Sequence, residues 1–86
     1  MPRWRIEWSE EADRDVSKLE TPVAKRIFSK LEKAAEEPAR YFSRLRGCDD
    51  FKLRVGDYRV KVLLLREKET VFVEKVGHRR NIYKRR

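Results

Sequence analysis

The run from residue 51 to residue 61, FKLRVGDYRVK, constrains the fold of this chain more than any other segment. Apolar and basic residues alternate on both sides of a Gly-Asp pair, which is the pattern of a β-hairpin with a two-residue turn. A turn at Gly56 and Asp57 places Val55 opposite Tyr58. Counting outward from that turn pairs the basic residues with one another, Arg54 with Arg59 and Lys52 with Lys61.

The predicted hairpin has one apolar face and one basic face, because side chains alternate across a strand. The apolar face holds Phe51, Leu53, Val55, Val60 and Val62. The four cations share the other face, where like charges set directly opposite one another destabilise a sheet. This arrangement indicates that a polyanion binds the basic face, and we expect the polyanion to be RNA.

The net positive charge of the chain lies entirely in its C-terminal half. The formal net charge is +8, with a pI of about 10.0. Residues 1–43 hold nine basic and nine acidic residues, whereas residues 44–86 hold fourteen basic and six acidic residues. A one-sided basic field is typical of nucleic-acid binding, although a membrane surface or an acidic protein partner also matches it.

Length and composition indicate a single cytoplasmic domain over residues 1–86. The longest apolar run, residues 62–65, is far too short to cross a bilayer, and the N-terminus lacks the order of a signal peptide. A single cysteine, Cys48, excludes an internal disulfide and a cysteine-based metal cluster. We therefore expect no membrane association and no cofactor.

Patterns along the chain predict an α+β domain with the element order β-α-α-β-β-β. Alternation over residues 4–8 indicates a first strand with an apolar face. Ser9 can cap a helix with an acidic first turn, and Thr21 with Pro22 is a second helix start, of a helix that ends near Pro38. The predicted sheet is small, twisted and mainly antiparallel, with both helices packed on one face and the opposite face open.

The last strand is expected to pair with the second strand of the hairpin. The register that pairs apolar residues with apolar residues brings Lys61 opposite Glu74, so that a cation meets an anion. It also places Val76 beside Arg59. The segment that follows, GHRRNIYKRR, then leaves the sheet at the turn end of the hairpin.

Five groups can converge near that turn: Arg54, Arg59, His78, Arg79 and Tyr83. Metal-free RNA cleavage requires a 2′-hydroxyl to attack phosphorus while a base accepts its proton, an acid protonates the leaving 5′-oxygen and cations stabilise the charge. Arginine suits the last role because its planar fork matches phosphate oxygens. Histidine is the residue type that exchanges protons most readily near neutral pH.

The sequence offers no carboxylate cluster suited to magnesium, which favours a metal-independent transesterification that ends in a 2′,3′-cyclic phosphate. Lys52 and Tyr83 are further candidates for proton transfer. Each assignment has a plainer alternative: His78 can be structural, Tyr83 can pack against the C-terminal segment, and Glu74 can simply balance Lys61. Nonspecific phosphate contacts are expected from the remaining cations, Lys61, Arg80, Lys84 and Arg85.

Three motifs of the chain can be compared with known families: WRIEWSEEADRDVSKL, FKLRVGDYRVKV and VGHRRNIY. With the Leu45-Arg46-Gly47 step between the first two, they resemble the RelE/ParE superfamily of toxins from type II toxin-antitoxin pairs. The resemblance covers nearly the whole chain. It implies a small sheet with two helices, and a RelB-like acidic antitoxin that wraps the toxin in a hetero-oligomer.

The resemblance also implies an activity. RelE-like members are mRNA interferases that cut messages in the ribosomal A site, whereas ParE-like members poison DNA gyrase and lack the catalytic set. The RelE-like working residues fall on five positions of this chain, with His78 where the family often has another cation. Those positions are Lys52, Arg54, Arg59, Arg79 and Tyr83.

The sequence therefore leaves three possible functions open. The first is a ribosome-dependent mRNA endonuclease, which the basic cluster favours. The second is a gyrase poison that acts without RNA chemistry. The third is a basic RNA-binding or ribosome-binding domain without catalytic activity.

Overall fold

The computed structural model describes residues 3–44 and 50–78. The predicted order β-α-α-β-β-β is confirmed, and two short elements are added to it between the second helix and the hairpin. The elements are β1 (Arg5–Trp8), α1 (Glu10–Ser17), α2 (Thr21–Ala34), α3 (Pro38–Tyr41), β2 (Ser43–Arg44), β3 (Phe51–Val55), β4 (Tyr58–Leu65), a 3-10 turn (Arg66–Lys68) and β5 (Thr70–His78).

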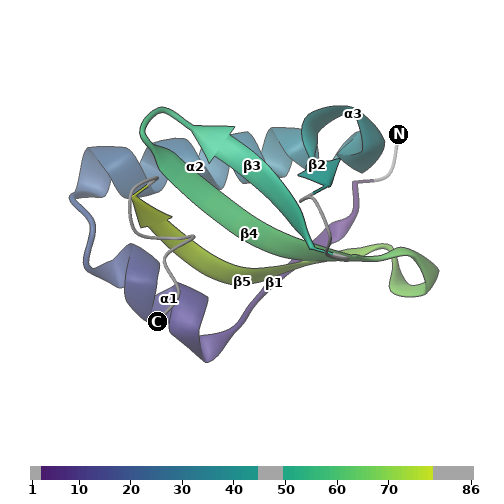
Figure 1. The fold of residues 1–86 in the computed structure, drawn as a ribbon, viewed down its shortest axis with the longest axis horizontal. Coiled ribbons are helices and arrows are strands. Elements are labelled where there is room, and N and C mark those ends of the chain that lie inside the picture. The colour runs from purple at the N-terminus through teal and green to yellow at the C-terminus, as the bar shows by residue number, and fades with distance from the viewer. Residues whose placement is uncertain (1–2, 45–49, 79–86) are drawn as a thin grey trace.

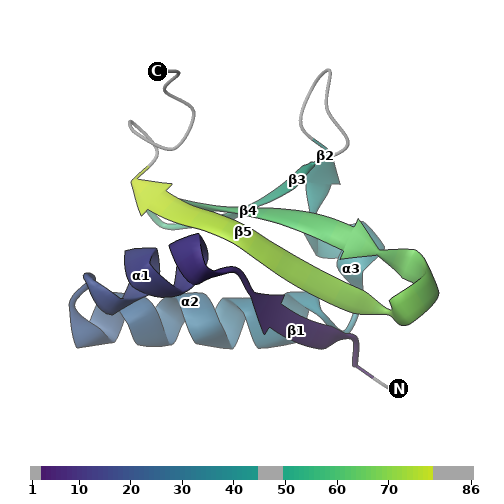
Figure 2. The ribbon, with the colours of Figure 1, turned by 90° about the horizontal axis from the view of Figure 1, so that it is seen from below.

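The strands form one sheet in the order β1-β5-β4-β3-β2. Strand β1 runs parallel to β5, and the other neighbours are antiparallel, so the sheet is mainly antiparallel as predicted. Helices α1 and α2 lie on the same face of this sheet (Figures 1 and 2). No described helix lies on the opposite face. No helix within residues 3–44 or 50–78 is long and apolar enough to cross a membrane.

The core lies between the sheet and the two helices. Val60, Val62, Val71 and Val73 of the central strands are fully buried, because each projects to the helix side of the sheet. From the helices, the buried residues include Ala12, Val16, Ile27, Leu31 and Ala34.

The helix starts follow the sequence signals closely. Ser9 caps α1, with its Oγ accepting a hydrogen bond from the Ala12 N–H at 2.9 Å. Helix α2 begins at Thr21 itself, so Glu20 is the N-cap and Pro22 lies in the first turn. The predicted end near Pro38 is wrong, since α2 ends at Ala34. Pro38 instead begins α3, where proline has no helical hydrogen bond to lose.

The hairpin has the predicted register. Val55 pairs with Tyr58, Arg54 with Arg59 and Lys52 with Lys61. Gly56 has a φ of +57°, and Asp57 is not among the residues with positive φ. This combination fits a turn with glycine at its first central position, the type II′ form whose twist matches the flanking strands.

The register of β4 with β5 agrees with the prediction only as far as Val62 opposite Val73. A bulge then shifts the pairing, so Lys61 meets Lys75 rather than Glu74. Val76 consequently lies opposite Val60 instead of beside Arg59. The unshifted register would place Lys75 opposite the fully buried Val60. The extra residue, Glu74, avoids that burial of a charge.

Candidate nucleic-acid interface

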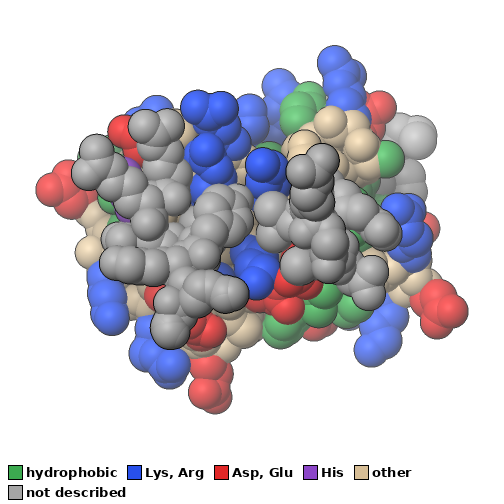
Figure 3. Space-filling view, viewed as in Figure 1, with side chains coloured by type: hydrophobic (Ala, Val, Ile, Leu, Met, Phe, Trp, Pro, Cys, Tyr) green, Lys and Arg blue, Asp and Glu red, His purple; other side chains and the backbone are tan. Residues whose placement is uncertain are grey.

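The predicted block of four cations is present on the sheet. Lys52 lies opposite Lys61, and Arg54 lies opposite Arg59 on the adjacent strand. Their neighbours in sequence, Leu53, Val55, Val60 and Val62, are buried against the helices, so alternation directs the four cations away from the helices. Figure 3 shows Lys and Arg side chains near the centre and along one edge of this face.

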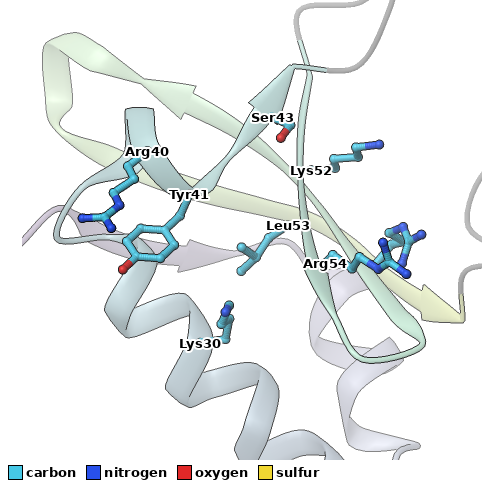
Figure 4. Close-up of a pocket in the computed structure, with 8 residues that line it drawn as sticks. Lys30, Arg40, Tyr41, Ser43, Lys52, Leu53 and Arg54 are labelled. Atoms are coloured by element: carbon cyan, nitrogen blue, oxygen red, sulfur yellow. The ribbon is translucent and has the colours of Figure 1, made fainter.

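A hollow of about 370 Å³ adjoins this block at the edge of β3. Three of the predicted site residues, Lys52, Arg54 and Arg59, line it together. Figure 4 shows Lys52 and Arg54 projecting from β3 on one side of the hollow, with Tyr41 and Arg40 on the other. The full lining is Lys30, Arg40, Tyr41, Ser43, Lys52, Leu53, Arg54 and Arg59.

The guanidinium of Arg59 is partly buried. The side chain is half-buried, and its Nη1 is shielded from solvent with no hydrogen-bond partner in the described part of the chain. A buried N–H without a partner costs free energy that an incoming acceptor recovers. A phosphate oxygen is such an acceptor and also carries charge. Arg59 is thus a candidate ligand for an anion.

Lys61 differs from the other three cations because a neighbouring carboxylate already pairs with it. Its Nζ lies 3.3 Å from Asp50 Oδ2. The predicted partner, Glu74, is the residue of the bulge, and its Oε1 is buried with no hydrogen-bond partner among residues 3–44 and 50–78. Burial, reinforced by the nearby Asp50 carboxylate, raises the pKa of Glu74 above its usual value. Asp50 therefore takes the role that the sequence suggested for Glu74.

His78 lies on the opposite side of the sheet from Arg54 and Arg59. It pairs with Tyr58 at the end of β5, and the two rings contact edge to face with centroids 5.5 Å apart. Alternation along the strands places both residues on the side of the buried Val60 and Val76, which is the helix side. The expected convergence of His78 with Arg54 and Arg59 is therefore wrong.

The remaining predicted residues, Arg79, Arg80, Tyr83, Lys84 and Arg85, lie outside the described residues. The strand that precedes them was expected to end at Val76, but it continues through Gly77 to His78. Gly77 pairs with Arg59 and His78 with Tyr58, so β5 finishes beside the turn of the hairpin.

Several residues of the hollow were not identified from sequence patterns. Tyr41 lies between two cations, with Lys30 Nζ 5.9 Å and Arg40 Cζ 5.5 Å from the centre of its ring. These distances are typical of cation-π contacts, which hold the cations at the rim of the hollow. The available signal was a basic stripe on α2, in which Arg26, Lys30 and Lys33 recur at helical spacing.

Comparison with known sequences gives a family. The model for the "ParE toxin of type II toxin-antitoxin system, parDE" matches residues 6–83 of this chain. No curated protein sequence matches it.

Several solved structures with a similar fold come from RelE toxins and from complexes of RelE with RelB. The chain is 26% identical to one in the RelBE2 toxin-antitoxin complex of Mycobacterium tuberculosis, with a TM-score of 0.84 and coverage of 91% of this chain and 93% of that one. It is 31% identical to a chain of the intact Escherichia coli RelBE complex, with a TM-score of 0.74 and coverage of 87% and 95%. A chain of the archaeal RelE-RelB complex from Pyrococcus horikoshii is 17% identical over 93% of this chain and 99% of its own length, and its TM-score of 0.75 shows the shared fold.

Proposed function

Since the chain belongs to the family of ParE toxins of type II toxin-antitoxin systems, within the RelE/ParE superfamily, we propose that this toxin is a ribosome-dependent mRNA endonuclease. The observation that carries the proposal is the pairing of Arg54 with Arg59 beside Lys52 on the sheet face without a described helix. A gyrase poison that acts by binding a protein would not need this cluster of cations for RNA chemistry. We also propose that residues 1–86 form one toxin domain.

The proposed reaction is an internal transesterification of RNA. The 2′-oxygen forms a bond to the adjacent phosphorus, the bond from phosphorus to the 5′-oxygen breaks, and the products are a 2′,3′-cyclic phosphate and a 5′-hydroxyl. One proton leaves the 2′-hydroxyl and one reaches the departing 5′-oxygen. Arg59 and Arg54 would bind the non-bridging oxygens, where negative charge develops.

Other residues complete the proposed site. Lys52 lines the same hollow and can neutralise the attacked phosphate or exchange a proton with the ribose. Arg79 and Tyr83 enter through the resemblance of VGHRRNIY to RelE-like sequences, as a second phosphate ligand and a proton-transfer group. Lys61, Arg80, Lys84 and Arg85 would contact flanking phosphates. His78 is left out of the set because its ring faces Tyr58 on the helix side.

The proposed partners follow from the relatives. Toxin-antitoxin complexes of RelE with RelB are among the matching structures, which supports a RelB-like acidic antitoxin as the mate of this basic chain. The proposed substrate is mRNA on the ribosome, and the proposed location is therefore the cytoplasm. Toxin and antitoxin together would form a hetero-oligomer.

The family match also favours a second candidate function. ParE is the name that the matching family model carries, and a ParE-like toxin would inhibit DNA gyrase by binding it as a protein. Such a toxin would not depend on the buried Nη1 of Arg59 for its action. This difference separates the two candidates.

The test is a reconstituted translation reaction in which the message is mapped by primer extension, run beside a gyrase supercoiling assay. We expect cleavage within the ribosomal A site, a cyclic-phosphate end, and a loss of about a hundredfold with Arg59→Ala. The control is Lys68→Ala, an exposed cation of the 3-10 turn. An intact message with blocked supercoiling would favour the gyrase candidate. Salt-sensitive RNA binding without cleavage would leave only a binding domain.

A further inference from the structure

Strand β1 is an edge of the sheet, at the end opposite to β3. Its one described neighbour is β5, which runs parallel to it. The Arg5 N–H donates to the Glu69 carbonyl at 2.9 Å, and the Ser9 N–H donates to the Val73 carbonyl at 2.9 Å. Residues 5, 7 and 9 therefore face β5, and the alternate residue Ile6 directs its N–H and C=O away from β5. No described residue bonds to the backbone of Ile6 on that side.

The outer side of β1 lacks most of the features that keep edge strands from pairing. Figure 2 looks onto this edge, and no described helix or strand lies in front of β1. The strand contains no lysine or proline, and its register with β5 has no bulge. Arg5 and Glu7 are exposed, and neither has an ion pair with a described residue. Because β1 has four residues, its backbone alone would pair weakly, and side chains must contribute.

Aromatic side chains supply that contribution on the helix side of the edge. Ile6 and Trp8 pair with buried residues of β5, which places both on the side of the helices. The Trp8 ring contacts the Phe28 ring of α2 edge to face, with centroids 5.4 Å apart. Phe28 keeps 43% of its surface exposed, and Trp4 and Trp8 are half-buried. An aromatic cluster of this kind at an unpaired strand edge is suited to contact with another protein surface.

The order of residues along this edge, WRIEW over residues 4–8, is self-complementary. If two copies pair antiparallel about Ile6, Arg5 of each copy lies opposite Glu7 of the other, and Trp4 lies opposite Trp8. The charged pairs then share the open face and the aromatic pairs share the helix face, where both types of cross-strand pair are favourable. The two Ile6 residues exchange both of their outward hydrogen bonds.

We propose that this toxin forms a two-fold symmetric homodimer through the outer edge of β1, in which the two sheets join into one. This dimer goes beyond the proposed function and does not depend on it. A two-fold interface requires that each contact occurs twice with the partners exchanged, and the positions of Arg5 and Glu7 about Ile6 satisfy this requirement. A strand of a different protein would not require that symmetry, so the sequence favours a second copy of this chain.

The dimer leaves the proposed RNA site open. Strand β3 lies three strands away from β1 in the sheet order, so Lys52, Arg54 and Arg59 stay clear of the interface. A two-fold axis perpendicular to the joined sheets also places the open faces of both copies on the same side. Substitutions in β1 can therefore change association without touching the cations of the proposed site.

A charge exchange tests the register. Sedimentation velocity of the full-length toxin from about 1 µM to about 300 µM should show a monomer–dimer equilibrium, as expected for a small interface. Glu7→Arg and Arg5→Glu should each weaken association at least about tenfold, because two opposite-charge pairs become like-charge pairs. An equimolar mixture of the two variants should associate like the wild type, since two arginines then face two glutamates. Lys68→Glu, at the exposed 3-10 turn, is the control and should behave like the wild type.

Tryptophan fluorescence provides a second measurement. Trp4 and Trp8 are the two tryptophans of the chain, and both lie at the proposed interface. Their emission should shift to shorter wavelength as the concentration of the wild type rises, and should stay constant for Glu7→Arg over the same range. Phe28→Ala should weaken association several-fold through the lost aromatic contact, and its folding is protected by the exposure of Phe28.

Three results would overturn the proposed dimer. They are a wild type that stays monomeric at every concentration, single charge variants that associate like the wild type, and a mixture of the two variants that does not regain association. RNA cleavage is measured separately in the translation reaction and should persist in Glu7→Arg. A toxin that dimerises as described but cleaves no message would reject the proposed function and leave the dimer in place.

Discussion

The two sides of the sheet end in different ways. Next to β5, beyond the end of β1, helix α1 and its cap bond to the strand. The Ser9 N–H donates to the Val73 carbonyl at 2.9 Å, and Ser9 Oγ donates to the Glu74 carbonyl at 2.8 Å. Further along α1, Asp15 accepts a hydrogen bond from the Val76 N–H at 3.0 Å. Next to β3, the described residues that pair with the strand are the two of β2. On one side α1 and its cap bond to the strand backbone, whereas on the other no described residue bonds to the backbone of Arg54.

The two sides of the sheet also differ in whether their cations have carboxylate partners. Beside β5, Lys75 bonds to Glu11 at 2.9 Å and lies 3.8 Å from Asp15. Its bond to Glu11 raises the pKa of Lys75 and lowers the pKa of Glu11. Beside β3, Arg54 and Lys30 have no such partner among the described residues. We infer that the α1 side contributes stability and the β3 side contributes function, and substitutions can separate the two.

The largest effect is expected from Arg59. Replacing it with leucine should lower the cleavage rate about a hundredfold to a thousandfold, because a donor to the developing charge on phosphate is lost. The free energy of unfolding should stay the same or rise, since a buried unpaired N–H and a like-charge contact with Arg54 are both removed. Primer-extension rates and urea denaturation measure the two quantities. A large loss of stability would mean that Arg59 supports the fold.

Replacement of Asp15 should have the opposite effect, lowering stability while leaving cleavage unchanged. Asp15→Ala leaves the N–H of the buried Val76 without an acceptor, which should lower the free energy of unfolding by about 2 kcal/mol. Cleavage by the folded fraction should be unaffected. Asp13→Ala, an exposed carboxylate of the same helix, is the control and should change stability by less than about 0.5 kcal/mol. If the two substitutions had equal effects on stability, the hydrogen bond from Val76 to Asp15 would not stabilise this edge of the sheet.

Ser9 should contribute somewhat less than Asp15 to the free energy of unfolding. Ser9→Ala removes the cap of α1 and the bond to the Glu74 carbonyl, and we expect a loss of about 1 kcal/mol. Ser9→Asp keeps the acceptor for the Ala12 N–H but cannot donate to the carbonyl. If Ser9→Asp is as stable as the wild type in urea denaturation, the cap alone matters and the bond to β5 does not.

The sequence predicted the elements that have a local signal. Alternation specified the hairpin and its register, and Ser9 specified a helix start. The bulge at Glu74 was missed because cross-strand charge pairing favoured Lys61 with Glu74, whereas the cost of burying Lys75 decided the register. His78 was misplaced for the same reason, since a one-residue shift exchanges the faces of every residue beyond it.

Residues from distant elements were harder to predict than residues of the hairpin. Lys52, Arg54 and Arg59 lie within one hairpin, so counting along two strands brought them together. Lys30 and Tyr41 reach the same hollow only because α2 and α3 pack beside β3. Periodicity shows that α2 has a basic stripe but not which strand that stripe faces.

Glu74 gives the smallest predicted effect, and its sign depends on pH. Burial, with the nearby Asp50 carboxylate, raises the pKa of Glu74 in the folded state above the value of 4.5 for an unperturbed glutamate. Its contribution to stability is therefore fully present below that value and is lost as pH rises through the folded-state pKa. Glu74→Gln removes the charge, so it should stabilise the toxin at neutral pH by less than about 1 kcal/mol, in proportion to its partial exposure.

The advantage of Glu74→Gln should disappear as the solution is acidified, because the wild-type carboxyl then becomes neutral as well. Urea denaturation of both proteins at neutral and at acidic pH measures this difference. Glu67→Gln, at an exposed position of the 3-10 turn, should show no such dependence. Should Glu74→Gln destabilise the protein at neutral pH, the bulge would need the negative charge to balance Lys61. Lys61 would then need two carboxylates, whereas we infer that Asp50 alone balances its charge.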